Sequence, residues 1–333
     1  MFRSSNVIAP SDGLGRWNPS TPATAAAMPP AAPGSTVRRS SPREAEQSVK
    51  AESDLLTAGE FALRTPRARL DDVVLPLTTK RRVEGLLTRV RQHRLIQEDW
   101  GYGEIDPRHR AATISLYGPP GTGKTLLAEA IAGEFGQPLL EVDYAALESK
   151  YVGETAKNLA WAFQQAEAQG AALFFDEADS MLGRRMSNVT QAADQAVNVT
   201  RAVLLKLLDN ARGLVLFATN LMRNYDPAFA RRILMHVEVG PPDSPARAEI
   251  LRRLTPPRVP GRDQLDYTAL AEASDGLVGG DLKNAMLEAL CHAAARSGAE
   301  QSLRLDDLLA AFEHIRCAKN VIPVDAQPWN VLD

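Results

Sequence analysis

The sequence predicts an α/β fold in which a parallel sheet is flanked by helices and is followed by a small all-helical domain. Three observations carry this prediction. Between residues 113 and 240, apolar runs of strand length alternate with longer runs of helical spacing, which is typical of βα units in a parallel sheet. The first strand leads through a glycine-rich loop, Gly118–Thr125, into a helix. After Gly240-Pro241-Pro242 the strand signals stop and only helical segments follow.

Residues 1–66 are expected to form a disordered tail. Pro19–Ser35 holds five prolines among alanines, serines and threonines, a composition that buries too little apolar surface to offset the entropy of ordering. Residues 1–43 also carry five arginines against one acid, which faintly resembles an organelle transit peptide, but the proline density favours a plain tail. Within the tail, residues 44–63 could form a short helix when a partner binds.

Residues 67–112 are expected to form a short extended segment and a helix that packs on the core. Apolar side chains gather in residues 70–77. From Lys80 to Trp100 they recur at helical spacing, and Gly101 then ends the helix.

Residues 113–240 are expected to form the α/β core, and residues 241–333 a small helical domain with a C-terminal tail. The expected strands are Thr113–Tyr117, Pro138–Asp143, Ala171–Phe175, Leu214–Ala218 and Met235–Val239. The expected helices of the core are Lys124–Phe135, Ala156–Gln169 and Gln195–Asp209. The expected helices of the small domain are Ser244–Leu254, Tyr267–Ala273, Gly280–Arg296 and Asp306–Cys317.

Composition excludes several classes of function. The net charge of −3 gives no overall field that would favour nucleic acid or an anionic membrane, so neither is an expected partner. No apolar run approaches the roughly 20 residues of a membrane span. Two cysteines, Cys291 and Cys317, cannot make a disulfide framework, and their spacing from His292 and His314 is not that of a zinc site. We expect buried thiols on helices and a reducing, cytoplasmic location.

The stretch Gly118–Thr125 fits the phosphate-loop pattern G-x-x-x-x-G-K-[ST] at every fixed position. Glycines let the backbone wrap a polyphosphate closely, and the N–H groups of the loop and of the following helix supply partial positive charge. Lys124 can reach the β- and γ-phosphates, and the Thr125 hydroxyl can bind Mg²⁺. The pattern therefore predicts a nucleoside triphosphate site. Its candidate residues are Gly118, Pro119, Pro120, Gly121, Thr122, Gly123, Lys124, Thr125 and Leu126.

Acidic and polar side chains follow two later strands. Asp176 and Glu177 end the apolar run before them, and we expect Asp176 to face the phosphates from the strand beside the loop and to hold Mg²⁺. Glu177 could polarise the attacking water, which favours hydrolysis over binding alone. Asn220 ends another strand and could orient the same water. Arg231 and Arg232 could reach a neighbour's γ-phosphate in a ring, although a solvated basic turn would have the same sequence.

Taken together, the motifs resemble the AAA family of ring ATPases within the wider AAA+ group. They cover roughly residues 67–317 in the order typical of that family: Gly118–Thr125, Phe175–Asp179, Ala218–Asn220 and Asp226–Arg232. The adjacent arginines resemble those of the spastin- and katanin-like subgroup. The stretch Asp176–Arg185 resembles bacterial AAA proteins associated with phage-tail-like injection systems.

The resemblance implies roles for particular residues. Glu177 would be the base and Asn220 a sensor of the γ-phosphate, while Arg231 and Arg232 would act on a neighbour's nucleotide. ATP and Mg²⁺ are the implied cofactors. The adenosine would lie near Val73 and Val74 and near the lid motif Gly279 and Gly280. The stretch Lys150, Tyr151 and Val152 resembles the family's pore loop, with Tyr151 gripping an extended polypeptide.

The preferred functional reading is a homo-oligomeric, hexameric ATPase that remodels, unfolds or disassembles a protein through a central pore. The N-terminal tail would recruit the substrate or an adaptor. An alternative is an ATP-dependent assembly switch, loader or scaffold with slow hydrolysis, which should tolerate loss of the Tyr151 ring. A DNA-associated ATPase is a further alternative, but the acidic balance counts against it.

Overall fold

A computed structural model describes residues 61–106, 110–143, 154–183, 192–220 and 225–321 of the chain. All of these residues belong to one compact unit, Lys50–Asp333. Among them, no helix combines the length and the apolar character needed to cross a membrane.

The described residues form a six-stranded sheet in the order β1-β3-β4-β5-β2-β6. The strands are β1 (Phe61–Arg64), β2 (Ala112–Tyr117), β3 (Leu139–Asp143), β4 (Ala172–Asp176), β5 (Leu214–Thr219) and β6 (Met235–Glu238). Strands β2 to β6 pair in parallel, which confirms the predicted sheet, whereas β1 pairs antiparallel with β3.

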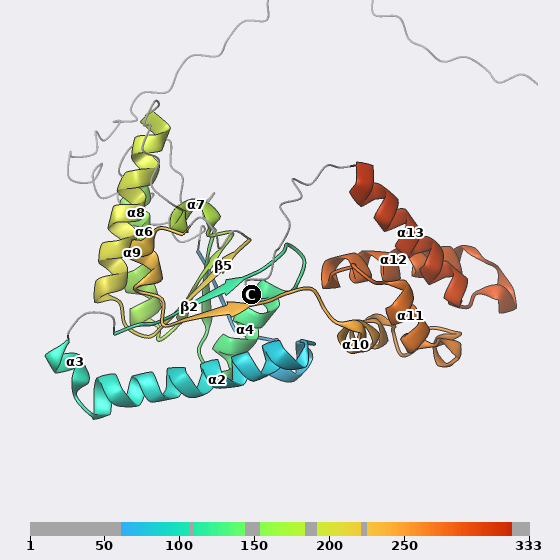
Figure 1. The fold of residues 1–333 in the computed structure, drawn as a ribbon, viewed down its shortest axis with the longest axis horizontal. Coiled ribbons are helices and arrows are strands. Elements are labelled where there is room, and N and C mark those ends of the chain that lie inside the picture. The colour runs from blue at the N-terminus through green and yellow to red at the C-terminus, as the bar shows by residue number, and fades with distance from the viewer. Residues whose placement is uncertain (1–60, 107–109, 144–153, 184–191, 221–224, 322–333) are drawn as a thin grey trace, which may run out of the picture. The chain divides into compact units, whose positions relative to one another are not determined.

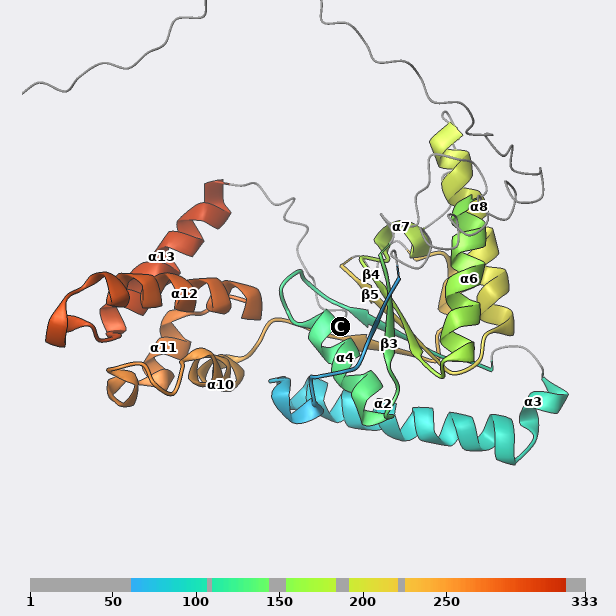
Figure 2. The same cartoon turned by 180° about the vertical axis from the view of Figure 1, so that it is seen from behind.

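Helices cover both faces of this sheet, with α2 and α4 on one face and α6 and α8 on the other (Figure 1, and from behind in Figure 2). The helices of the core are α2 (Leu77–Arg94), α3 (Tyr102–Ile105), α4 (Lys124–Glu134), α6 (Glu154–Ala168), α7 (Asp179–Leu182), α8 (Ala192–Asn210) and α9 (Pro227–Ala230). Short non-α turns lie at Leu70–Asp72 and Leu95–Asp99.

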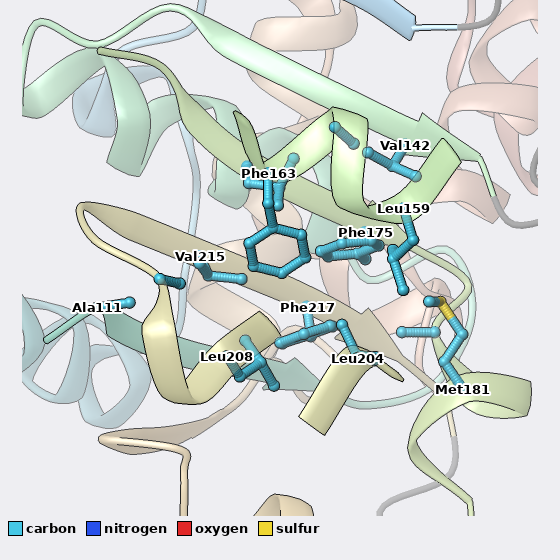
Figure 3. Packing of buried hydrophobic residues seen from close by; sticks show 14 of the residues in the cluster. Ala111, Val142, Leu159, Phe163, Phe175, Met181, Leu204, Leu208, Val215 and Phe217 are labelled. Atoms are coloured by element: carbon cyan, nitrogen blue, oxygen red, sulfur yellow. The ribbon is translucent and has the colours of Figure 1, made fainter. Parts of the chain in front are cut away.

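Alternation along the strands explains why both faces are buried. In β4, Leu173 and Phe175 join the core under α6 and α8, while Phe174 joins the core under α2 and α4. The Phe175 and Phe217 rings stack with centroids 4.9 Å apart (Figure 3). A strand buried on both faces reads as a continuous apolar run, which is why the strands of the core were predictable to within about two residues of their ends.

Two predictions about the sheet were wrong. Phe61–Arg64 was assigned to the disordered tail, and its first residues to a short helix, but it forms edge strand β1 against β3. The strand of Asp176 was expected beside the phosphate loop, but β5 lies between β4 and β2. Both outcomes depend on pairing between distant segments, which local sequence patterns do not report.

The C-terminal helices form a small domain with its own apolar core. They are α10 (Ser244–Leu254), α11 (Tyr267–Ala273), α12 (Gly279–Ala295) and α13 (Leu305–Val321), with turns at Arg262–Gln264 and Gly298–Glu300. The expectation of buried thiols was wrong, because Cys291 and Cys317 are exposed. On α12 the buried face runs through Ala285, Ala289 and Ala293, so residue 291 lies on the other face of the helix.

Candidate active site

The glycine-rich loop joins the carboxyl end of β2 to the amino end of α4, as its sequence predicts. Gly118 has a φ of 153°, and a Cβ on it would lie 2.1 Å from the Val239 carbonyl oxygen. Gly121 has a φ of 76°, and its Cβ would lie 3.0 Å from Val278 Cγ2. Both positions therefore require glycine, because a side chain would meet backbone or the neighbouring domain.

Lys124 is the first residue of α4 and is only 8% exposed. Its ammonium donates to the carbonyl oxygens of Gly118 at 2.9 Å and Pro119 at 2.8 Å, and to Asn220 Oδ1 at 2.8 Å. Burial lowers the pKa of Lys124, and the carboxylates of Asp176 and Asp179 oppose that shift. The two acids thus help to keep a buried cation charged beside the loop.

Thr125 and Asp176 provide adjacent oxygen atoms at the same edge of the sheet. The Thr125 hydroxyl donates to Asp176 Oδ2 at 2.8 Å, although their elements are separated by β5. A hydroxyl and a carboxylate are ligand types that Mg²⁺ prefers, so these residues fit the predicted metal.

Glu177 is exposed, and its φ of 49° places it in the left-handed region. Its own N–H donates to Asp176 Oδ1 at 2.9 Å. Left-handed geometry is strained for a residue with a side chain, and such strain is found most often at functional positions.

Asn220 is held in place by Asp179, a residue to which the sequence analysis gave no role. The Asn220 N–H donates to Asp179 Oδ1 at 2.9 Å, and its Nδ2 donates to Asp179 Oδ2 at 3.4 Å. The hydroxyl of the fully buried Thr219 also donates to Asp179 Oδ1. Asp179 therefore fixes the direction in which the Asn220 side chain meets Lys124.

These groups share one cavity of about 610 Å³. Of the predicted residues it is lined by Val73, Val74, Pro120, Gly121, Thr122, Gly123, Lys124, Thr125, Leu126, Asp176, Glu177, Asn220, Gly279 and Gly280. The helical domain contacts the loop directly, because the Gly280 N–H donates to the Gly121 carbonyl oxygen at 2.9 Å. Gly118 and Pro119 contribute the carbonyl acceptors described above rather than cavity wall.

The cavity also contains residues that the sequence analysis missed, among them Ile250, Leu254 and Lys283. Ile250 and Leu254 recur at helical spacing on α10, but that pattern predicts only an apolar face and not what it faces. Asp179 had a signal of its own, since it lies three residues beyond Asp176 in a stretch already rich in acids.

Arg231 and Arg232 do not line the cavity, and they differ from each other. Arg232 makes a two-pronged ion pair with Asp209 of α8, at 2.6 and 2.8 Å, and also donates to the Ala228 carbonyl oxygen at 2.7 Å. Hydrogen bonding to Asp209 raises the pKa of the Arg232 guanidinium. Arg231 is exposed. The predicted pore-loop residues Lys150, Tyr151 and Val152 lie outside the described residues.

Similarity to known proteins agrees with this geometry. Residues 114–241 match the model of the ATPase family associated with various cellular activities (AAA). The chain is 36% identical over 214 residues to the probable 26S proteasome regulatory subunit 10B of Caenorhabditis elegans, covering 62% of this chain and 52% of that protein. It is 34% identical to protein SAV of Sulfolobus acidocaldarius, covering 77% and 32% of the two chains. It is 37% identical to the cell division cycle protein 48 homolog of Archaeoglobus fulgidus, covering 59% and 27%.

The chain thus spans about a quarter to a half of the length of these relatives. The finer resemblances, to the spastin- and katanin-like subgroup and to the bacterial proteins, stay predictions. The match at residues 114–241 contains the phosphate loop, both acids and Asn220, which are the groups gathered around the cavity. Residues 114–241 of the chain therefore form an AAA ATPase domain.

Proposed function

We propose that this chain binds ATP with Mg²⁺, hydrolyses it, and uses the energy as a homo-oligomeric ring to unfold or remodel a protein. The observation that carries the proposal is the convergence of Lys124, the Thr125–Asp176 pair, Glu177 and Asn220 at one edge of the sheet. A glycine-rich turn that matched the motif by chance would not bring these groups from three strands into one cavity.

Each residue has a distinct task in this proposal. Lys124 would exchange the carbonyl acceptors of its own loop for oxygens of the β- and γ-phosphates. Thr125 and Asp176 would hold Mg²⁺, which when bound offsets the negative charge of the phosphates. Glu177 would accept a proton from the attacking water, and Asn220 would orient that water towards the γ-phosphate.

The proposed adenosine site lies between the two domains of the unit. Val73 and Val74 line one side of the cavity, and Ile250 and Leu254 of α10 also line it. These apolar side chains suit a planar base, while the contact between Gly280 and Gly121 brings the helical domain up to the phosphate loop. A bound nucleotide would therefore contact both the core and the helical domain and would influence the position of the helical domain.

Assembly and substrate are argued from the chemistry of the arginines and from the relatives. Arg231 is exposed, and an arginine supplied from a neighbour can stabilise charge on a transferring phosphoryl group. Two of the similar proteins are named as a proteasome regulatory subunit and a cell division cycle protein 48 homolog. The first of these names supports a role in acting on proteins. We further propose a ring with Tyr151 at its pore, an N-terminal tail that recruits substrate or adaptor, and a cytoplasmic location.

The test is the sedimentation mass of Glu177→Gln with and without ATP. Removing the base should stop turnover while leaving ATP binding intact, so ATP should drive the variant into an assembly of about six subunits. Lys124→Ala is the matched control, because it should lose affinity for ATP and stay unassembled at the same nucleotide concentration. A Glu177→Gln variant that hydrolyses ATP at the parental rate would remove Glu177 from the role of base. A Glu177→Gln variant that binds ATP but stays monomeric would refute the proposed ring assembly.

A further inference from the structure

The segment that carries the two arginines begins at Tyr225, whose side chain is 9% exposed. Phe229 and Ile233 of the same segment are buried in the core beneath α6 and α8. The backbone at its start is fixed as well, since the Asp226 N–H donates to the Leu182 carbonyl oxygen at 2.9 Å and Tyr225 forms a β-bridge with Gly183. Residues 225–233 are thus anchored near the end of α7, which directly follows the acidic motif.

The Tyr225 hydroxyl lies beside β2 and β5, two of the three strands that end at the cavity. It lies 2.6 Å from Ser115 Oγ on β2. The Thr219 side chain on β5 is close enough to influence the pKa of the Tyr225 hydroxyl. Ser115 precedes Gly118 by three residues, and Thr219 directly precedes Asn220. One hydroxyl therefore joins the arginine segment to the strand of the phosphate loop and to the strand of Asn220.

These contacts extend a continuous polar path from the nucleotide cavity. Lys124 donates to Asn220, Asn220 and Thr219 both donate to Asp179, and Thr219 meets Tyr225. Ser115 and Thr219 are fully buried, so their hydroxyl groups make hydrogen bonds within the protein in place of hydrogen bonds to water. A phenylalanine facing an alanine would fill almost the same space without burying polar atoms. What the Tyr225–Ser115 pair adds is a fixed direction and not apolar burial.

We propose that the Tyr225 hydroxyl is a positioning group, which holds the Arg231 segment in register with the phosphate loop and Asn220. The proposal rests on the proposed function, in which Arg231 completes a neighbour's site. Because residues 225–233 are packed as one unit, a change in their attachment at Tyr225 moves the base from which Arg231 extends. Tyr225 would then set how well each subunit serves its neighbour, without touching nucleotide itself.

The test compares Tyr225→Phe with the double variant Tyr225→Phe/Ser115→Ala. The single variant leaves the Ser115 hydroxyl buried without this partner, so its Tm should fall. The double variant removes both hydroxyls and should regain most of the Tm. If the hydroxyl positions the segment, kcat should be about tenfold lower in both variants, with KM for ATP within about twofold of the parent. Tyr267→Phe in the helical domain is the control and should keep full kcat, because its buried hydroxyl has no hydrogen-bond partner among the described residues.

A second comparison asks whether Tyr225 acts through Arg231. The variants Tyr225→Phe, Arg231→Ala and their combination form a cycle in kcat. If Tyr225 works by placing Arg231, the combination should be no slower than Arg231→Ala alone, within about twofold. If the two effects multiply, or if kcat returns with Tm in the Ser115→Ala double variant, the positioning role is overturned and the proposed ATPase stands. If Arg231→Ala keeps full kcat, two claims are refuted: that Arg231 acts on a neighbour's nucleotide, and that Tyr225 positions it.

Discussion

Replacement of Asp179 should damage both the fold and the chemistry, and the structure gives the size of each effect. In Asp179→Ala, the Thr219 hydroxyl and the Asn220 N–H lose the carboxylate that accepts their hydrogen bonds. A hydrogen bond to a charged group contributes about 1.5–3 kcal/mol to the free energy of unfolding. Two such bonds give about 3–6 kcal/mol, which is a large share of the roughly 5–15 kcal/mol that stabilises a typical domain.

Asp179→Asn is the more informative variant because it keeps the shape and one acceptor oxygen. Half of the loss, about 2 kcal/mol, should lower Tm by about 4–8 °C for a unit of this size. Since Asn220 would lose one of the two carboxylate oxygens that fix its direction, kcat should fall by more than about tenfold while KM for ATP changes little. Circular dichroism melting and steady-state ATP hydrolysis measure the two effects on the same preparation. Asp281→Asn, at the start of α12 in the helical domain, is a matched control for the loss of a carboxylate that accepts a backbone N–H.

This reasoning is refuted if Asp179→Asn lowers Tm without lowering kcat. If Asp179→Asn loses Tm as expected but retains kcat within about twofold, the hydrogen bonds to Asn220 stabilise the fold and do not orient a catalytic group. If kcat falls only in proportion to the folded fraction, measured at the assay temperature, the same conclusion follows. A fall in kcat at full folded fraction is the result that supports the orienting role.

Three further predictions concern the two arginines, Tyr225 and Tyr151. Arg231→Ala subunits mixed with parental subunits should lower kcat more than the mixing ratio predicts, and a strictly proportional fall would contradict action on a neighbour. Arg232→Ala should in addition lower the free energy of unfolding by about 1–2 kcal/mol, because it breaks the ion pair between Arg232 and Asp209, whose side chains are 21% and 24% exposed respectively. Burial raises the pKa of Tyr225 to about 12 from 10.0, so the stability that the neutral hydroxyl provides below pH 10 should be lost as pH rises to about 12. In urea unfolding, the parent should lose about 2–3 kcal/mol more of its free energy of unfolding over this pH range than Tyr225→Phe does. Identical alkaline profiles for the two proteins would contradict the raised pKa. Tyr151→Ala should abolish unfolding of a tagged substrate but spare ATP hydrolysis, and retained unfolding would favour the assembly switch.

The residues that we propose to bind phosphate could be placed from the sequence because their constraints are local. Gly118 and Gly121 need conformations or contacts that only glycine permits, and Lys124 and Thr125 sit at fixed offsets from them. The acids follow the buried five-residue run Ala171–Phe175, so their place at a strand end is also encoded nearby. The sequence predicted that these residues share a nucleotide site, and in the structure all of them except Gly118 line one cavity.

Contacts between distant segments were not predictable in the same way. Strand β1 is four residues long and depends on β3, about 75 residues away in the chain, for its pairing. The insertion of β5 between β4 and β2 is likewise a matter of topology, yet Asp176 still reaches Thr125 because parallel strands end at one edge. The exposure of Cys291 is different. It follows from the phase of α12 and could have been predicted by counting from Ala285 and Ala289.

The adjacent arginines illustrate how neighbours in sequence acquire different tasks in a fold. The guanidinium of Arg232 donates hydrogen bonds to Asp209 and to the backbone of α9, and the bonds to Asp209 attach the end of its segment to α8. At the start of the segment, Tyr225 ties it to β2 and β5. Arg231 lies next to the first anchor and six residues from the second, yet it is exposed. Because the backbone of this segment is held at both ends, only the side chain of Arg231 has to be ordered when it meets an anion, which limits the entropy cost for an arginine that completes a neighbour's site.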